Sequence, residues 1–371
     1  MRPVFTAGSQ IRRLSTHVVA EPVFEPAPRV RLARITDLAA LVEISRRAQR
    51  AAHDDAAAIR SLGLPIAPAA LSLYQLFRMP LSLIRSSDAI WVHQRGPTLD
   101  GLARVEREPH GDWTIVELAA VDDAARARLV ARVVREAGRH GVVRIHVACR
   151  DDAGTLRLLS TSGFQVYARE TLYARHLNPT EPLATTAPAA ARQGRVGSPL
   201  RAAQAADAAR IAQLIARITP PAVARVEIVD AREWERAAAG EWIPRASISP
   251  LLRLVDGRSF VVDGEAGEIG GWVHLGIAHE PGEEHAHTMR VVTLPGVDPA
   301  PLISATLAEA TARAPRAEGA AGAILAVVRS YESGLGGALR AHGFSEIADL
   351  RLAVRDARAR VTAPGMVPAI G

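Results

Sequence analysis

The chain has 371 residues, of which 48% are hydrophobic, so it is long enough to form two domains that each bury a core. Its formal net charge is +6, and the basic residues are all arginine. These arginines are scattered along the sequence, whereas nucleic-acid-binding proteins concentrate basic residues on one face. We therefore expect no nucleic-acid partner.

Cys149 is the only cysteine, which excludes an intrachain disulfide and disfavours a cysteine-based metal site. We predict no metal. No segment approaches the 18 apolar residues that a membrane-spanning helix needs, and the N-terminus lacks the apolar core of a secretory signal. The sequence predicts a cytoplasmic protein without a membrane partner.

Regular patterns begin after residues 1–28, which show no sustained period and are interpreted as an N-terminal arm. Alternation at Val30 predicts a strand, and Asp37 is placed to cap the helix that follows. The first half then predicts a helix at 38–52, a helical stretch at 70–87, strands at 89–94, 99–106 and 113–121, a helix capped by Asp122 and Asp123, and a closing strand, helix and strand.

Residues 179–197 are rich in Pro, Ala, Thr and Gly without periodicity and are interpreted as a linker. The order of elements then restarts, with Asp207 in the place of Asp37. The second half predicts a helix, a helical region at 231–239, strands at 259–263, 269–278 and 287–294, a helix capped by Asp298 with proline at its first position, and the same closing pattern. We therefore divide the chain into domains at 29–178 and 198–358, with a tail at 359–371.

The two closing patterns are alike. Each has an apolar strand, an arginine, a short helix, a Gly-Phe pair and an alternating strand. The pairs Gly163-Phe164 and Gly343-Phe344 lie 180 residues apart. A repeat of that length indicates a duplicated domain, because solenoid repeats are far shorter.

This order of elements, occurring twice, resembles the GNAT (GCN5-related N-acetyltransferase) fold. The resemblance implies an α+β protein of two tandem GNAT-like domains, each a mixed, mostly antiparallel sheet flanked by helices. It also implies transfer of an acetyl or other acyl group from acetyl-CoA or another acyl-CoA to an amine of a small molecule or peptide, by a monomer or homodimer.

In this family the diphosphate of the cofactor lies on backbone amides where the central helix begins, since those amides lack partners within the helix. The usual loop, Gln/Arg-x-x-Gly-x-Gly/Ala, is absent from both halves, and the second half has Gly296 and three prolines there. Helix capping by Asp122 and Asp123 is the competing interpretation of the first-half loop. The candidate cofactor-binding residues are Val121, Asp123, Ala124, Ala125 and Arg126.

The family often uses a carboxylate on the central strand as general base, and Glu117 fits that place. Glu117 also fits the solvent-facing position of an alternating strand. The comparable second-half residue lies near Thr293. The tyrosine that many members use to protonate the thiolate is replaced by Leu159 and Leu339. If one half is catalytic, we expect it to be the first.

Two classes of function stay open at this point, an acyltransferase and a silent scaffold or ligand-binding protein that kept the fold. The remaining candidates each have a structural alternative: packing for the tyrosines, a solvated turn for the histidines, helix–sheet packing for the glycines and a core position for the tryptophan. They are Tyr167, Tyr173, Tyr331, His285, His287, Gly334, Gly336, Gly337 and Trp234.

Overall fold

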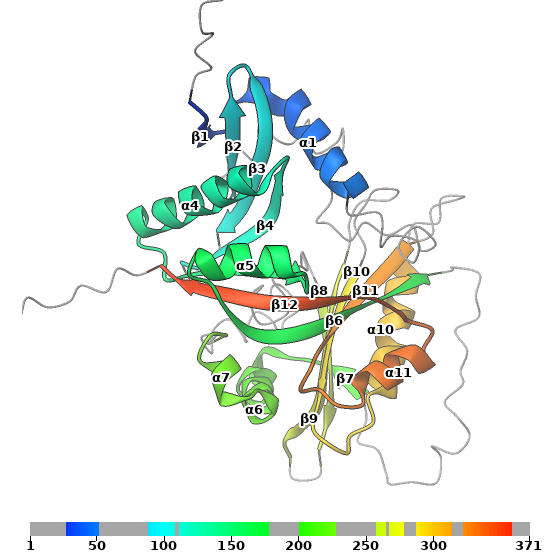
Figure 1. The fold of residues 1–371 in the computed structure, drawn as a ribbon. Coiled ribbons are helices and arrows are strands. Elements are labelled where there is room, and N and C mark those ends of the chain that lie inside the picture. The colour runs from blue at the N-terminus through cyan, green and yellow to red at the C-terminus, as the bar shows by residue number, and fades with distance from the viewer. Residues whose placement is uncertain are drawn as a thin grey trace, which may run out of the picture.

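A computed structural model describes residues 27–51, 88–107, 111–177, 200–227, 257–264, 267–277, 287–313 and 322–357. Among these, twelve strands form one sheet, with helices on both faces (Figure 1), so the expected α+β class is confirmed. The sheet order is β1-β2-β3-β4-β5-β12-β6-β11-β10-β9-β8-β7. The helical stretches predicted at 70–87 and 231–239, the latter with Trp234, lie outside the described residues.

The first half follows the predicted order closely, and its short 3-10 turn at Ile35–Asp37 leads into the first helix. Its elements are β1 (Arg29–Leu32), α1 (Leu38–Ala51), β2 (Asp88–Arg95), β3 (Thr98–Arg107), β4 (Trp113–Ala120), α4 (Asp123–Arg139), β5 (Arg144–Arg150), α5 (Ala153–Thr161) and β6 (Gln165–Leu177).

The second half repeats this order. Its elements are β7 (Leu200–Ala202), α6 (Ala208–Ile218), α7 (Pro221–Ala224), β8 (Gly257–Asp263), β9 (Ile269–Gly276), β10 (His287–Thr293), α10 (Ala300–Arg313), β11 (Gly322–Arg329), α11 (Leu335–Ala341) and β12 (Ser345–Asp356). The Asp298 carboxylate accepts the Ala300 N–H at 3.0 Å, as the predicted cap of α10 requires, but the helix begins at Ala300, so Pro299 precedes it instead of occupying its first position.

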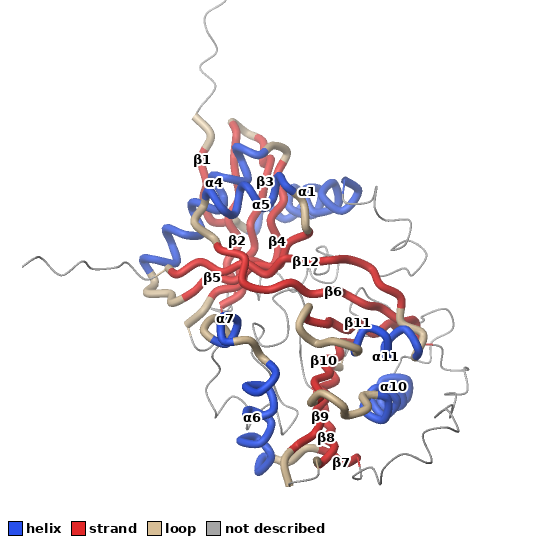
Figure 2. Tube along the Cα trace, turned by 60° about the horizontal axis from the view of Figure 1, so that its bottom comes forward, coloured by secondary structure: helices blue, strands red, loops and turns tan. Residues whose placement is uncertain are grey.

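Helices cover both faces of each half because the strands alternate apolar side chains between them. In the first half α4 and α5 bury Leu129 and Leu159 against one face, and α1 buries Leu41 against the other. In the second half α10 and α11 pack against one face of the sheet, where Leu302 is buried, and α6 packs against the opposite face. Figure 2 shows these helices on either side of the strands.

The last strands of the two halves are exchanged. β12 pairs antiparallel with both β5 and β6, and β6 pairs antiparallel with β11. Both views show β12 and β6 side by side between the two halves (Figures 1 and 2). Each half therefore has its sheet completed by a strand from the other half.

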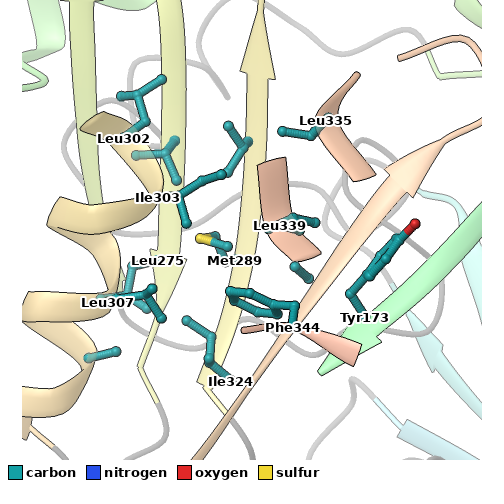
Figure 3. Close-up of a cluster of buried hydrophobic side chains, with 14 of the residues drawn as sticks. Tyr173, Leu275, Met289, Leu302, Ile303, Leu307, Ile324, Leu335, Leu339 and Phe344 are labelled. Carbon is teal, nitrogen blue, oxygen red and sulfur yellow. The ribbon is translucent and has the colours of Figure 1, made fainter. Parts of the chain in front are cut away.

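Both Gly-Phe pairs end their helices in the same Schellman motif. Gly163 and Gly343 have φ of +81° and +78°, which glycine adopts without strain. Phe164 N–H donates to Leu159 O at 2.9 Å, and the equivalent bond runs from Phe344 to Leu339 at 3.1 Å. Figure 3 shows Leu339 and Phe344 within the second-half core. The two leucines are thus the buried partners of the motif.

An arginine from each exchanged strand closes the helix end of the other half. Arg355, on β12, donates to the carbonyl of Ser162 at the end of α5. Arg175, on β6, donates to the carbonyl of His342 at the end of α11 at 2.6 Å. A guanidinium at a helix C-terminus satisfies an orphan carbonyl and interacts favourably with the helix dipole. The exchange is therefore fixed by side chains as well as by strand pairing.

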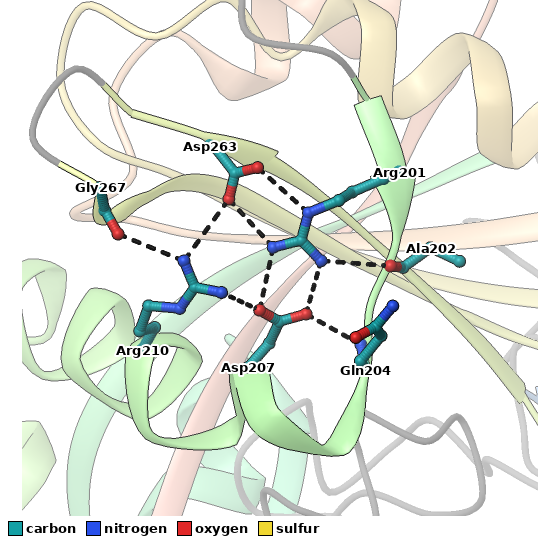
Figure 4. A network of polar contacts seen from close by, with 7 residues as sticks. All are labelled: Arg201, Ala202, Gln204, Asp207, Arg210, Asp263 and Gly267. Carbon is teal, nitrogen blue, oxygen red and sulfur yellow. Dashed lines mark hydrogen bonds and ion pairs between the residues drawn. The ribbon is translucent and has the colours of Figure 1, made fainter.

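Each half also begins with the same arginine–aspartate pair. Arg31 donates twice to Asp37, and Arg201 donates twice to Asp207. In the second half Arg210 and Asp263 join this network (Figure 4). The hydrogen bonds from Arg201 outweigh burial and lower the pKa of Asp207 to about 2. The pair ties the first strand of each half to the start of its first helix.

Two neighbouring glycines of α11 provide a matched test of packing. A Cβ on Gly336 would lie 2.6 Å from the Tyr173 hydroxyl, whereas a Cβ on Gly337 meets nothing within 4 Å. We expect Gly336→Ala to destabilise the protein by about 1–3 kcal/mol through overpacking, and Gly337→Ala to stabilise it by about 0.5–1 kcal/mol. Urea unfolding of the two variants measures both effects. Equal changes in unfolding free energy for the two variants would contradict the interpretation that these glycines serve helix–sheet packing.

Candidate active site

The two central strands of the first half diverge. Among the described residues, β4 and β5 pair in parallel at Trp113–Ile115 with Ile145–Val147. Beyond that point β4 continues to Ala120 and β5 to Arg150 without further pairing in this ladder. Unpaired strand edges expose backbone donors and acceptors. The first half therefore offers backbone groups to an extended ligand between its central strands.

Glu117 lies where the strands diverge. The register of β3 and β4 shifts between Arg104 and Val105, so that Glu117 faces Arg104 and Ile115 faces Val105, with Val116 as the extra residue of a β-bulge. The Arg104 Nε lies 3.7 Å from the Glu117 Oε2, beyond hydrogen-bond range, and the two side chains are 10% and 12% exposed. Glu117 is thus largely buried beside a cation, and the solvent-facing interpretation of this residue is wrong.

The start of α4 is capped by its own aspartate. The Asp122 carboxylate accepts the Ala125 N–H at 2.7 Å and the Arg95 guanidinium at 2.8 Å, and these two bonds lower the pKa of Asp122. Asp123 pairs with Arg126 at 2.7 Å, and its side chain is 82% exposed. Val121 is 71% exposed. The candidate cofactor-binding residues therefore lie together at the start of α4, where Val121 and Asp123 are exposed, whereas Ala125 is buried and its amide is engaged by Asp122.

No acid replaces the missing tyrosine within α5. Leu159 is 2% exposed and packs in the first-half core. Cys149, on the neighbouring strand, is partly buried. Its burial raises the pKa of its thiol to about 12, with a smaller contribution from the negative charges of Asp152 and Asp151. A thiol held protonated in this way is a poor nucleophile.

The second half repeats the divergence with different chemistry. β10 and β11 pair at His287–Met289 with Ile324–Ala326, and then separate. Counted along the β9–β10 ladder, the position of Glu117 corresponds to Arg290 and not to Thr293. Arg290 is 4% exposed and forms a bidentate ion pair with Glu332. The second half therefore carries a cation where the first carries a carboxylate.

Next to that pair lies a fully buried second arginine. Arg329 ends β11 and contacts Glu227 at 2.8 Å and Glu170 at 3.5 Å. Burial alone would lower its pKa, but the two carboxylates outweigh it and raise the pKa. Glu170 comes from the exchanged strand β6 and Glu227 follows α7. The Arg329–Glu170 pair joins the two halves, whereas the Arg329–Glu227 pair lies within the second half.

The remaining sequence candidates lie in packing positions. Burial raises the pKa of Tyr167, beside Glu227, and raises that of Tyr331 to about 12, so both phenols stay protonated. His287 begins β10 and is 2% exposed, which makes the solvated-turn interpretation wrong for this residue, while His285 lies outside the described residues. In the part of the chain that the structure describes, no three or more His, Cys, Asp or Glu side chains are grouped so that they could hold a metal ion. No helix of that part is long and apolar enough to cross a membrane.

Several features of the site have weak sequence signals. The arginines of the exchanged strands, Arg175 and Arg355, each follow the Gly of Gly-Phe by twelve residues. Their equivalent positions in the repeat could therefore have marked them as a matched pair. The Arg290–Glu332 pair and a hydrogen bond between Asp112 and His146 join segments far apart in sequence, and no sequence motif predicts them.

Comparison with protein-family models and with curated proteins found no match. Among solved structures, a tandem GNAT protein from the clavulanic acid biosynthesis pathway superposes with a TM-score of 0.51 at 13% identity, covering 90% of this chain and 99% of that one. A GCN5-related N-acetyltransferase from Sphaerobacter thermophilus gives 0.52 at 14% identity, covering 90% and 96%. At such identities the likeness concerns the fold, and both matches extend over nearly the whole chain. The chain therefore has the tandem GNAT fold that the repeated Gly-Phe pattern predicted.

Proposed function

We propose that the first half transfers an acyl group from acyl-CoA, with acetyl-CoA as the reference donor, to an amine of a small molecule or peptide, and that Glu117 is the general base. The observation that carries the proposal is the bulged, diverging strand β4 with a buried carboxylate at the bulge. The second half has Arg290 at that place, held by Glu332, and an arginine cannot accept a proton.

For the cofactor we propose the turn formed by Val121, Asp123, Ala124, Ala125 and Arg126. Its exposed position and the first amides of α4 suit a diphosphate, which the helix dipole also favours. Because Asp122 already accepts the Ala125 N–H, the Asp123 and Ala124 amides and the Arg126 guanidinium carry most of this role.

Loss of the family's tyrosine is compatible with transfer. A thiol has a pKa of about 8.5, so a thiolate is a good leaving group near neutral pH without a proton donor beside it. The more demanding proton transfer is the one from the amine, for which Glu117 is placed.

Replacing this base tests the proposal. We expect Glu117→Gln to lower kcat by about 100-fold or more, the usual contribution of a general base, with an unchanged unfolding midpoint. Steady-state release of free thiol from acetyl-CoA, measured over a panel of amines, gives kcat. Glu268→Gln, at an exposed ion pair with Arg217, is the matched control and should retain full activity. Unchanged turnover in Glu117→Gln would remove Glu117 from the mechanism.

The second candidate is a catalytically silent scaffold or ligand-binding protein. It is favoured by the capping of the Ala125 amide by Asp122, because that bond occupies an amide that a diphosphate would use. Direct measurement of acetyl-CoA binding separates the two candidates.

A further inference from the structure

We infer that His146, oriented by Asp112, is a second proton acceptor in the first-half site and acts together with Glu117. This inference rests on the proposed acyl transfer. His146 lies on β5 and is fully buried, and its Nε2 lies 3.2 Å from the Asp112 Oδ2. The other oxygen of Asp112 accepts the backbone N–H of Arg144 at 3.0 Å. The carboxylate is therefore anchored to the strand that carries the histidine.

The hydrogen bond to Asp112 places the imidazole proton on Nε2 and leaves the Nδ1 lone pair available. Nδ1 is buried and has no hydrogen-bond partner within the described structure, and the same holds for Oγ1 of Thr114, which neighbours His146 on β4. A buried polar atom without a partner costs about 1–3 kcal/mol, so two side by side indicate a place for a hydrogen-bonding ligand atom.

This pair lies on the same face of the sheet as Glu117. Thr114 faces Glu106 and Glu117 faces Arg104, and residues two apart on a strand share a face. Thr114 and Glu117 are therefore successive residues on one face of β4, with His146 beside Thr114 on β5. Leu102 on that face packs with Leu41 of α1. Thr114, Glu117 and His146 therefore lie on the face of the sheet that α1 covers, where β4 and β5 begin to diverge.

Acyl transfer to a protonated amine removes two protons from its nitrogen, and two neighbouring acceptors can take one each. An ammonium nitrogen starts with three hydrogens and ends, as the amide, with one. His146 Nδ1 takes the first proton, and the neutral amine forms the C–N bond at the thioester carbonyl. The C–S bond breaks with its electron pair leaving on sulfur as thiolate, and Glu117 takes the second proton from nitrogen. Both protons then pass to water and the thiolate, which restores the two side chains.

Burial without function is the competing explanation, and the second half supplies a control. His274 is also buried, burial lowers its pKa to about 3, and its partner is the hydroxyl of Ser259 at 2.9 Å. Its hydrogen-bond partner among the described residues is thus a hydroxyl where His146 has a carboxylate, and it lies outside the proposed site. Replacing His274 therefore measures the effect of losing a buried imidazole that has no role in the proposed reaction.

The experiment compares His146→Gln, Asp112→Asn and His274→Gln in the full chain, with acetyl-CoA and an amine that the wild type accepts. We measure kcat, the amine KM, the acetyl-CoA Kd by calorimetry, and the thermal midpoint. We expect His146→Gln to lower kcat by about 100-fold or more with the acetyl-CoA Kd unchanged, and Asp112→Asn to lower it by about 10-fold or more. His274→Gln should keep the wild-type kcat.

Wild-type kcat in His146→Gln would overturn the inference, and if that variant does not fold, wild-type kcat in Asp112→Asn overturns it equally. Loss of activity in Glu117→Gln together with full activity in His146→Gln would leave the proposed function standing and reject the second acceptor. Failure of the wild type to release thiol with any amine would reject both.

Discussion

A chain that ends after Phe344, and therefore lacks β12, is expected to lose cooperative folding in both halves. β12 supplies the partner of β5 and one partner of β6, and it buries Leu350 in the second-half core and Ala353 in the first-half core. Its removal leaves two long unpaired edges in the middle of the sheet and frees the Ser162 carbonyl from Arg355. The net stability of a domain is only about 5–15 kcal/mol, so a loss of this size leaves little folded protein.

The measurement is equilibrium urea unfolding, followed by far-UV circular dichroism and by the fluorescence of Trp113 and Trp272, which lie in the first-half and second-half cores. A chain ending at residue 357 keeps all the described pairing of β12 and is the control, which should unfold cooperatively. If the chain that ends after Phe344 kept a cooperative first-half transition at the control's midpoint, the exchange of strands would be contradicted.

Replacement of Arg329 is expected to have the largest effect of any single substitution considered. Arg329→Met leaves Glu227 and Glu170 in the interior without this cation, and breaking a buried ion pair from one side costs about 3–5 kcal/mol. The matched control is Arg217→Met, which removes the exposed ion pair with Glu268 and should cost about 0–1 kcal/mol.

Denaturant midpoints of these two variants give the comparison. A further variant, Arg329→Met with Glu227→Met, should recover part of the loss, because apolar side chains can replace a buried ion pair. Equal midpoints for Arg329→Met and Arg217→Met would show that the buried ion pairs of Arg329 stabilise the protein no more than an exposed pair does.

Local patterns predicted most of the fold. The Gly-Phe pairs fixed the ends of α5 and α11, because a left-handed residue at that position favours glycine and the buried Phe completes the Schellman motif. The alternating strands and the aspartate caps of α4 and α10 were likewise readable, since they depend on neighbours in sequence.

The exchange of the last strands could not be predicted in this way. β6 and β12 follow equivalent helices and have the same alternation, so each fits beside β5 or β11 by pattern alone. Which pairing forms depends on contacts between distant segments, such as that of Arg175 with His342. We propose 29–178 and 198–358 as the domains in sequence, with these two strands exchanged in space.

The site was predictable only in part. Glu117 was identified from its place on the central strand, but its pairing with Arg104 depends on a β-bulge that the sequence does not reveal. The β10–α10 connection is longer than the β4–α4 connection, so counting back from the helix cap led to Thr293, whereas the strand pairing gives Arg290. His146 carries no motif, because its partner Asp112 belongs to another strand connection.

Calorimetric titration of the full chain with acetyl-CoA tests the central claim, that the first half is an acyl-CoA site. We expect one site per chain with a Kd of the order of micromolar. Pro301 has no amide N–H at the second position of α10, whereas Ala124 provides one at the second position of α4. Ala124→Pro, tolerated in a first helical turn, should weaken binding about 10-fold or more. Absence of heat at high protein concentration, or unchanged affinity in Ala124→Pro, would contradict it.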